Sequence, residues 1–231
     1  MIRENLLEVR EKVLRACKRA GRDPQDVTLI AVSKTKPVED LCEAMKEGQK
    51  IFGENKVQEI MAKQEYFQDP TIEWHMIGHL QRNKVHYLIG NVALIHAVDS
   101  IRLAEQIEQA SQKAGVTTDI LLEVNMAREE SKFGFMEEEV CAALDAMKNL
   151  AHVNVRGLMT IAPFVENAEE NRPVFQQMYK LFVDMKAKTT DNIHMDILSM
   201  GMTGDYEVAI EEGATMVRVG TGIFGSRNYN I

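Results

Sequence analysis

Cysteine and proline are scarce in this chain, and it has no long apolar run. Its 231 residues include three cysteines and five prolines. Cys17, Cys42 and Cys141 form an odd set without CxxC spacing, so the pattern predicts reduced thiols in a cytoplasmic protein. The most apolar stretch, 88–98, is short and interrupted by polar residues. We therefore expect no membrane-spanning segment.

Basic residues are also in deficit. The chain has 27 Lys and Arg against 35 Asp and Glu, a net charge of −8, which disfavours nonspecific binding to nucleic acid or anionic membranes. The N-terminal sequence MIRENLLEVREK lacks the apolar core of a secretory signal. No linker or low-complexity segment interrupts the chain. We expect one domain that spans residues 1–231 and has neither nucleic acid nor membrane partners.

Short β-branched runs alternate with amphipathic stretches, such as the one containing Leu103, Ile107 and Ala110, whose apolar spacing predicts helices. The predicted strands are Val27–Ser33, Lys50–Gly53, Glu73–Ile77, Leu94–Val98, Asp119–Asn125, Val155–Thr160, Met195–Ser199 and Met216–Val219. Strands separated by helices imply parallel pairing through right-handed crossovers. With an extra helix over 5–20, the pattern predicts an α/β fold, a single (β/α)8 TIM barrel. An open doubly wound sheet is the alternative, but no glycine-rich fingerprint follows the first strand.

Active residues of such barrels lie where the strands end. The first strand ends in AVSKTKP, and the alternation of Ile30, Val32 and Lys34 places Lys34 on the barrel-lining face. Desolvation by an apolar lining favours the neutral amine, which is the form that condenses with an aldehyde. A solvated lysine at a strand end is the alternative interpretation.

The last two strands are followed by glycine-containing turns. MVRVGTGIFG contains Gly220 and Thr221, and LSMGMTGD contains Ser199 and Gly201. Glycines let backbone N–H groups approach an anion closely, and hydroxyls add donors. A phosphate site after strands seven and eight recurs in these barrels, so these residues predict a phosphate cup. Tight turns that need glycine only for backbone geometry are the alternative.

Arg218 lies within an apolar strand, where a guanidinium is costly unless it meets a ligand or an acid such as Glu123 or Asp196. Asn55 follows the second strand, either as a partner of a ligand or as a helix N-cap. A lysine, a phosphate cup and a flat cation between them match pyridoxal 5′-phosphate (PLP). A cofactor-free Schiff-base aldolase would use the lysine and the cup but gives no role to Arg218.

The two histidines of WHMIGHLQ, His75 and His79, have the i, i+4 spacing of a metal pair. That spacing suits zinc only on a helix, whereas this stretch is predicted to be a strand followed by a loop. We therefore expect no metal site.

Seven motifs together resemble one family over essentially the whole chain. They are AVSKTKP (31–37), FGENKVQE (52–59), WHMIGHLQRNK (74–84), SKFGF (131–135), RGLMTIAP (156–163), LSMGM (198–202) and MVRVGTGIFG (216–225). The sequence resembles the pyridoxal phosphate-binding homeostasis proteins, which are related to the N-terminal barrel of alanine racemase.

The resemblance implies a role for each candidate residue. Lys34 would carry PLP as a Schiff base, Arg218 would face the pyridine nitrogen, and Asn55 would lie beside the ring. The residues implied around the phosphate are Ser199, Gly201, Gly220 and Thr221.

The resemblance also implies intracellular PLP buffering or delivery with little or no turnover, and PLP-dependent apo-enzymes as partners. Arg218 would leave the pyridine nitrogen unprotonated and so weaken carbanion stabilisation. Racemisation needs a second base, and of the five tyrosines only Tyr206 follows a strand end; the others are Tyr66, Tyr87, Tyr179 and Tyr229. We expect no further domain after Ile231, and hence a monomer. A PLP-dependent racemase or decarboxylase is the alternative.

Overall fold

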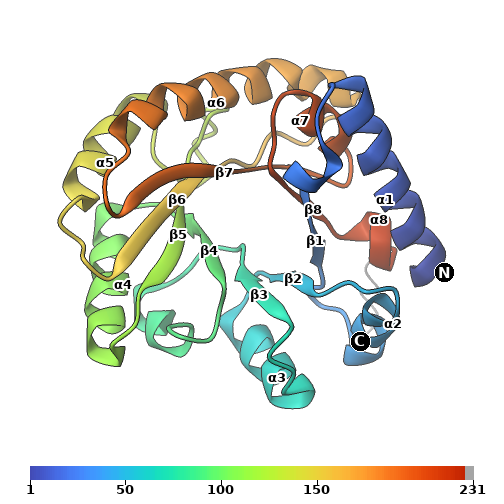
Figure 1. The fold of residues 1–231 in the computed structure, drawn as a ribbon, viewed down its shortest axis with the longest axis horizontal. Coiled ribbons are helices and arrows are strands. Elements are labelled where there is room, and N and C mark those ends of the chain that lie inside the picture. Colours follow the sequence, from blue (N-terminus) through green and yellow to red (C-terminus); the bar gives the residue numbers. More distant parts are fainter. Residues whose placement is uncertain (227–231) are drawn as a thin grey trace.

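The computed structural model describes residues 1–226, which form a closed barrel of eight parallel strands surrounded by helices (Figure 1). Each strand pairs with the next one in sequence, and β8 closes the barrel by pairing with β1. The strands are β1 (Thr28–Val32), β2 (Ile51–Glu54), β3 (Glu73–Met76), β4 (Leu94–Val98), β5 (Thr118–Glu123), β6 (Val153–Met159), β7 (Ile193–Met202) and β8 (Met216–Val219). The predicted (β/α)8 TIM barrel is confirmed.

The helices cover the outside of the barrel (Figure 1). They are α1 (Ile2–Arg19), α2 (Val38–Lys46), α3 (Val57–Phe67), α4 (Ile101–Ala114), α5 (Val140–Met147), α6 (Arg172–Met185), α7 (Tyr206–Glu211) and α8 (Thr221–Phe224). Helix α1 is the predicted extra helix, and it packs against α7 and α8. Between β3 and β4 the chain forms a 3-10 segment, Arg82–Tyr87.

Local sequence explains how α4 begins and ends. The Ser100 side chain accepts a hydrogen bond from the backbone N–H of Leu103, as expected of an N-cap. Gly115 ends the helix with a φ of 67°, a left-handed conformation that glycine adopts without steric cost.

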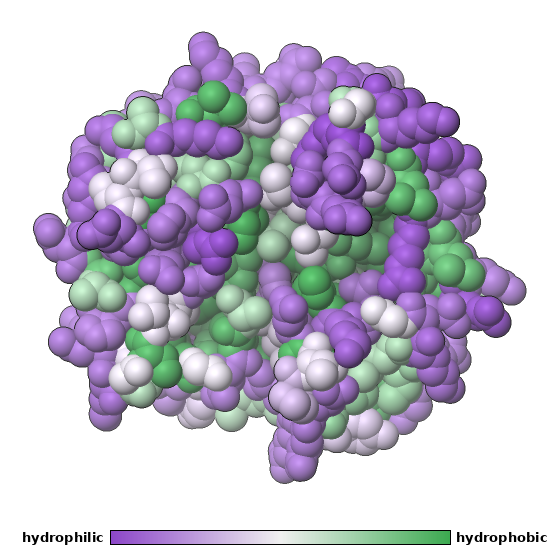
Figure 2. All heavy atoms as spheres, viewed as in Figure 1, coloured by the Kyte–Doolittle hydropathy of each residue, from purple (hydrophilic) through white to green (hydrophobic). Residues whose placement is uncertain are grey.

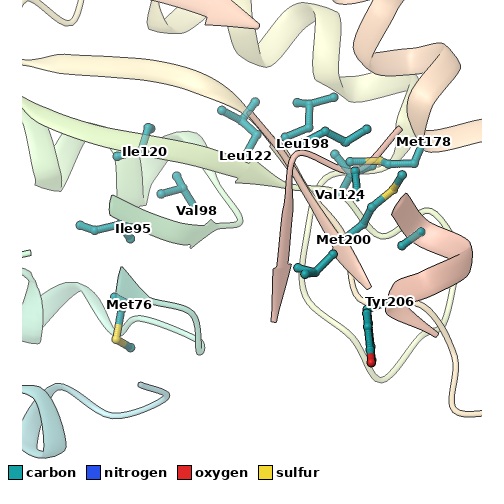
Figure 3. Packing of buried hydrophobic residues seen from close by; sticks show 14 of the residues in the cluster. Met76, Ile95, Val98, Ile120, Leu122, Val124, Met178, Leu198, Met200 and Tyr206 are labelled. Carbon is teal, nitrogen blue, oxygen red and sulfur yellow. The ribbon is translucent and has the colours of Figure 1, made fainter. Parts of the chain in front are cut away.

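Two hydrophobic clusters form the core, one on each face of the strands. The larger lies between strands and helices and includes Leu122, Leu198 and Met178 (Figure 3). The smaller consists of Leu94, Ala97, Leu121 and Met159. The adjacent residues Leu121 and Leu122 fall in different clusters because successive strand side chains point to opposite faces. The smaller cluster therefore fills part of the barrel interior.

None of the helices within residues 1–226 is long and apolar enough to cross a membrane. The face of the molecule in Figure 2 is covered mainly by hydrophilic residues, with hydrophobic residues visible in the hollows between them.

Candidate functional site

The carboxyl ends of the strands surround a cavity of about 940 Å³. Its lining comes from the ends of β1, β5, β7 and β8 and from segments that follow β2, β3, β5 and β6. Five of the seven candidate residues line it: Lys34, Asn55, Arg218, Gly220 and Thr221. Because β1 and β8 are neighbours, the barrel brings residues from both ends of the sequence into one cavity.

Lys34 is partly buried and lines the cavity from a turn that follows β1. In this turn the Lys36 backbone N–H donates to the Ser33 carbonyl oxygen over 3.0 Å. Thr35 has a φ of 62°, which is uncommon for a β-branched residue. Its backbone N–H donates to Glu59 Oε2 over 2.7 Å. This hydrogen bond helps to hold the strained turn that presents Lys34.

A buried ionic network supports the same turn. Glu54 Oε1 accepts hydrogen bonds from Ser33 Oγ over 2.5 Å and from Lys63 Nζ over 2.6 Å. Lys63 Nζ also donates to the Ser33 carbonyl over 2.8 Å. Burial raises the pKa of Glu54 to about 7, although Lys63 acts in the opposite direction. This network was not predicted from the sequence, where its sign is an acidic residue at the end of an apolar strand.

The turns after β7 and β8 are joined by Thr203. Its hydroxyl oxygen accepts hydrogen bonds from the backbone N–H groups of Gly220, over 3.3 Å, and Gly222, over 3.2 Å. Thr203 and Gly204 line the cavity together with Gly220 and Thr221. Hydroxyl and backbone donors from two turns therefore meet at this side of the cavity, where sequence analysis predicted the phosphate cup.

Ser199 and Gly201 are not part of the cavity lining. Ser199 is fully buried, and its hydroxyl accepts a hydrogen bond from Arg218 Nη1 over 2.5 Å. Gly201 has a φ of 92° and packs against α7, where an added Cβ would lie 2.6 Å from Ala209 Cβ. The strand β7 continues past Ser199, so the turn that reaches the cavity begins at Thr203. In the sequence, this turn is indicated by the glycine-containing segment MTGD (202–205).

Arg218 is 4% exposed and lines the cavity. Its Nη2 donates to the Thr160 carbonyl over 2.9 Å. Burial lowers the pKa of Arg218 to about 10, so the guanidinium remains charged at neutral pH. Among residues 1–226, no ion pair joins it to Glu123 or Asp196, the two acids considered from sequence. Asp196 instead pairs with Arg156.

Four further titratable side chains line the cavity: Glu123, His79, Lys132 and Asp205. Burial and the nearby Asp99 carboxyl raise the pKa of Glu123 to about 7. His79 Nδ1 lies 3.1 Å from Asp99 Oδ2, and its ring stacks on Phe133 with a centroid distance of 3.9 Å. In the part of the chain that the structure describes, no group of three or more His, Cys, Asp or Glu side chains could hold a metal ion.

Asn55 reaches the cavity from the turn after β2. It is not the N-cap of α3, because that position belongs to Lys56. Tyr206, the tyrosine that sequence analysis placed near the mouth, is the first residue of α7 and is absent from the cavity lining. Tyr229 lies outside the described residues.

Comparisons with known proteins show which family this chain resembles. Residues 5–228 match the family described as "Alanine racemase, N-terminal domain". The chain is 44% identical over 226 residues to the pyridoxal phosphate homeostasis protein of Aquifex aeolicus, covering 98% of each chain. It is 39% identical over 231 residues to that of Haemophilus influenzae, covering 99% of this chain and 97% of the other.

Solved structures show the same relationship. PipY of Synechococcus elongatus, solved with PLP bound, is 35% identical, with a TM-score of 0.84 over 97% of this chain and 100% of its own. The alanine racemase of Clostridium difficile shares the fold alone, at 17% identity and a TM-score of 0.72, over 98% of this chain and 61% of that enzyme. The chain therefore belongs to the alanine racemase N-terminal domain family and, within it, to the pyridoxal phosphate homeostasis proteins.

Proposed function

We propose that this protein binds PLP through a Schiff base on Lys34 and buffers or delivers the cofactor in the cytoplasm, with little or no turnover. One observation carries the proposal: Lys34, Arg218 and the Gly220–Thr221 turn line the same cavity. An amine, a buried cation and backbone donors are suited to an aldehyde, a pyridine nitrogen and a phosphate, respectively. The structure of PipY with PLP bound supports PLP as the ligand.

The residues around the cavity fit PLP in distinct roles. Lys34 would bond to the aldehyde carbon, Arg218 would donate a hydrogen bond to the ring nitrogen, and Asn55 would lie beside the ring. The phosphate would be held by the turns after β7 and β8, that is by Thr203, Gly204, Gly220 and Thr221. Ser199 and Gly201 would act indirectly, Ser199 by holding Arg218 and Gly201 by allowing β7 to approach α7.

Two features support low turnover. Bound PLP supplies a strong electron sink only when its ring nitrogen is protonated. Arg218 has donors but no acceptor, so it favours an unprotonated nitrogen. A second base on the opposite face of the ring is needed for racemisation, and none of the described tyrosines lines the cavity.

The same proposal extends to the organisation and partners of the protein. Residues 1–231 would form one PLP-binding domain that acts as a monomer. PLP-dependent apo-enzymes would receive the cofactor, and nucleic acid would not be a partner. The net charge of −8 supports the last point.

A lysine substitution tests the covalent site. Purified protein loaded with PLP should be yellow, and borohydride should fix one PLP per chain on Lys34, as located by peptide mass spectrometry. Lys34→Ala should abolish this labelling. Lys46→Ala, which changes an exposed lysine on α2, should leave it unchanged. Labelling that persists in Lys34→Ala, or a protein that PLP cannot reconstitute, would refute the proposal and revive the aldolase alternative.

One observation favours a racemase or decarboxylase as the second candidate function. His79 lines the cavity and contacts Asp99, so an imidazole is available to move a proton there. The PLP-loaded protein should be incubated with a panel of amino acids. Turnover at about 1 per second or faster would establish an enzyme, whereas its absence supports the homeostasis function.

A further inference from the structure

A row of polar side chains, each within reach of the next, crosses the interior of the barrel. This polar file consists of Arg218, Ser199, His96, His75 and Glu73. Arg218 Nη1 donates to Ser199 Oγ over 2.5 Å, and Ser199 Oγ lies 3.0 Å from His96 Nδ1. His96 Nε2 lies 2.9 Å from His75 Nδ1. His75 Nε2 lies 3.9 Å from Glu73 Oε2. The file starts at the cavity and ends at the first residue of β3, on the opposite end of the barrel.

The file passes through the barrel and not around it. His96 is on β4 and Ser199 is on β7, two strands that are not neighbours in the sheet. Their hydrogen bond therefore spans the interior, beside the apolar cluster that includes Leu121 and Met159. His75, His96 and Ser199 are almost fully buried, whereas the Glu73 side chain is 58% exposed. A buried polar file in this setting is costly unless every member has a partner.

The end at Arg218 fixes the direction of the hydrogen bonds. A guanidinium has only donors, so the Ser199 oxygen accepts from it. The Ser199 hydroxyl proton then has His96 Nδ1 as its acceptor within reach. Burial lowers the pKa of His96 well below its ordinary value, so the ring is neutral and its single proton is on Nε2. That proton is donated to His75 Nδ1.

The end at Glu73 selects the same direction. With Nδ1 accepting, His75 carries its proton on Nε2, which has no hydrogen-bond partner among the described residues. The nearest acid is Glu73, and a carboxylate 3.9 Å away favours an N–H over a lone pair on Nε2. In the reverse direction, the Ser199 proton would be buried without an acceptor among the described residues, and the lone pair of His75 Nε2 would face the carboxylate. Both ends of the file therefore favour the same direction of the hydrogen bonds.

We propose that Ser199, His96 and His75 form a directional relay of positioning residues that orients Arg218 toward the cofactor ring. The relay holds both imidazoles in the Nε2–H tautomer and leaves the remaining guanidinium donors of Arg218 to the cavity. Its role toward the ring rests on the proposed function, in which Arg218 faces the pyridine nitrogen. The tautomers themselves are a property of the protein without PLP.

Nitrogen NMR of the protein without PLP tests the relay directly. With ¹⁵N-labelled histidine, His75 and His96 should both show the neutral Nε2–H pattern, with assignments taken from His75→Gln and His96→Gln. Ser199→Ala should change the Nδ1 signal of His96, because that atom loses its donor. Ser111→Ala removes a buried serine that is hydrogen-bonded to Thr118 on the outside of the barrel, so it should leave the nitrogen signals of both histidine rings unchanged. A protonated Nδ1 on His96 in the wild type, or an unchanged spectrum in Ser199→Ala, would overturn the proposal.

Absorption of the PLP-loaded protein tests the link to the ring. Ser199→Ala should shift the absorption maximum while borohydride still fixes PLP on Lys34, and Ser199→Thr should restore the wild-type spectrum because it retains the hydroxyl. An unshifted maximum at full labelling would refute the positioning role. If Ser199→Ala does not fold, the wild-type tautomers and the Ser199→Thr spectrum decide. Failure of PLP to bind to a protein that shows the expected tautomers would instead refute the proposed function.

Discussion

Two corners next to the cavity are held together by opposite kinds of interaction. The lysine corner, Ser33, Glu54 and Lys63, supports the turn of Lys34 with a buried ion pair. The glycine corner consists of Thr203, Gly220 and Gly222. It joins the turns after β7 and β8 with neutral hydrogen bonds to one hydroxyl.

The difference follows from what each corner is proposed to do. A buried ion pair adds little net stability, but it tolerates few alternative arrangements, which suits a turn that must present one amine. Neutral backbone donors carry no opposing carboxylate, so they suit an anion that enters and leaves. The lysine corner should therefore respond strongly to loss of charge, and the glycine corner to changes in backbone shape.

Loss of one member of the ion pair should have the largest effect. Lys63→Met leaves Glu54 buried without its cation, so we expect a loss of about 3–5 kcal/mol in the free energy of unfolding, measured with urea. Lys46→Met on the exposed surface should change it by less than about 0.5 kcal/mol. The double variant Glu54→Gln/Lys63→Met should recover part of the loss. A single variant as stable as Lys46→Met would show that the pair does not support the turn.

A change of backbone shape in the segment that leads to the glycine corner should have the second largest effect on stability. Gly201→Ala introduces a Cβ 2.6 Å from Ala209 Cβ at a φ of 92°. We expect destabilisation by about 1–3 kcal/mol, together with weaker PLP retention. A Cβ added at Gly204 would meet no atom within 4 Å, so Gly204→Ala is the control for stability. Equal melting temperatures for the two variants would contradict the expected steric effect.

Removal of the hydroxyl that joins the two turns should have a smaller effect. Thr203→Val takes the acceptor from the Gly220 and Gly222 N–H groups, at a cost of about 1–2 kcal/mol. Equilibrium titration should show weaker binding of PLP, while Thr203→Ser keeps the acceptor and should bind as the wild type does. Equal affinities of the valine and serine variants would exclude this role.

The two corners should also differ in how their free energy of unfolding depends on pH. Per pH unit, this is the smallest of the predicted effects. The folded pKa of Glu54 is about 7, above its ordinary value of 4.5, so the folded state binds this proton more tightly than the unfolded state. The stabilisation is complete below pH 4.5 and is lost as pH rises through 7, with a slope of at most about 1.4 kcal/mol per pH unit. Urea unfolding across this interval should show a shallower slope in Glu54→Gln. Thr203→Val should keep the wild-type slope, and a slope that is unchanged in Glu54→Gln would contradict the raised pKa.

Sequence periodicity was enough to predict the barrel. Two strands, β4 and β8, have the predicted bounds, and the extra helix lies at the N-terminus, although it begins at Ile2 and not at Asn5. These elements were predictable because alternating and helical apolar spacing reflects burial directly. The end of β7 was not, because its pairing with β8 shifts register between Ser199 and Met202 and extends the strand.

The same distinction holds for the site. Sequence by itself determined that Lys34, Asn55, Arg218, Gly220 and Thr221 lie at strand ends, because the topology of a parallel barrel places all such ends around one mouth. Only the tertiary structure placed Thr203 in the lining and Ser199 beneath it. Only the tertiary structure shows that Glu54 contacts Lys63 and that His96 contacts Ser199. Those contacts depend on strand register and on which side chains meet across the barrel, and neither leaves a periodic trace along the chain.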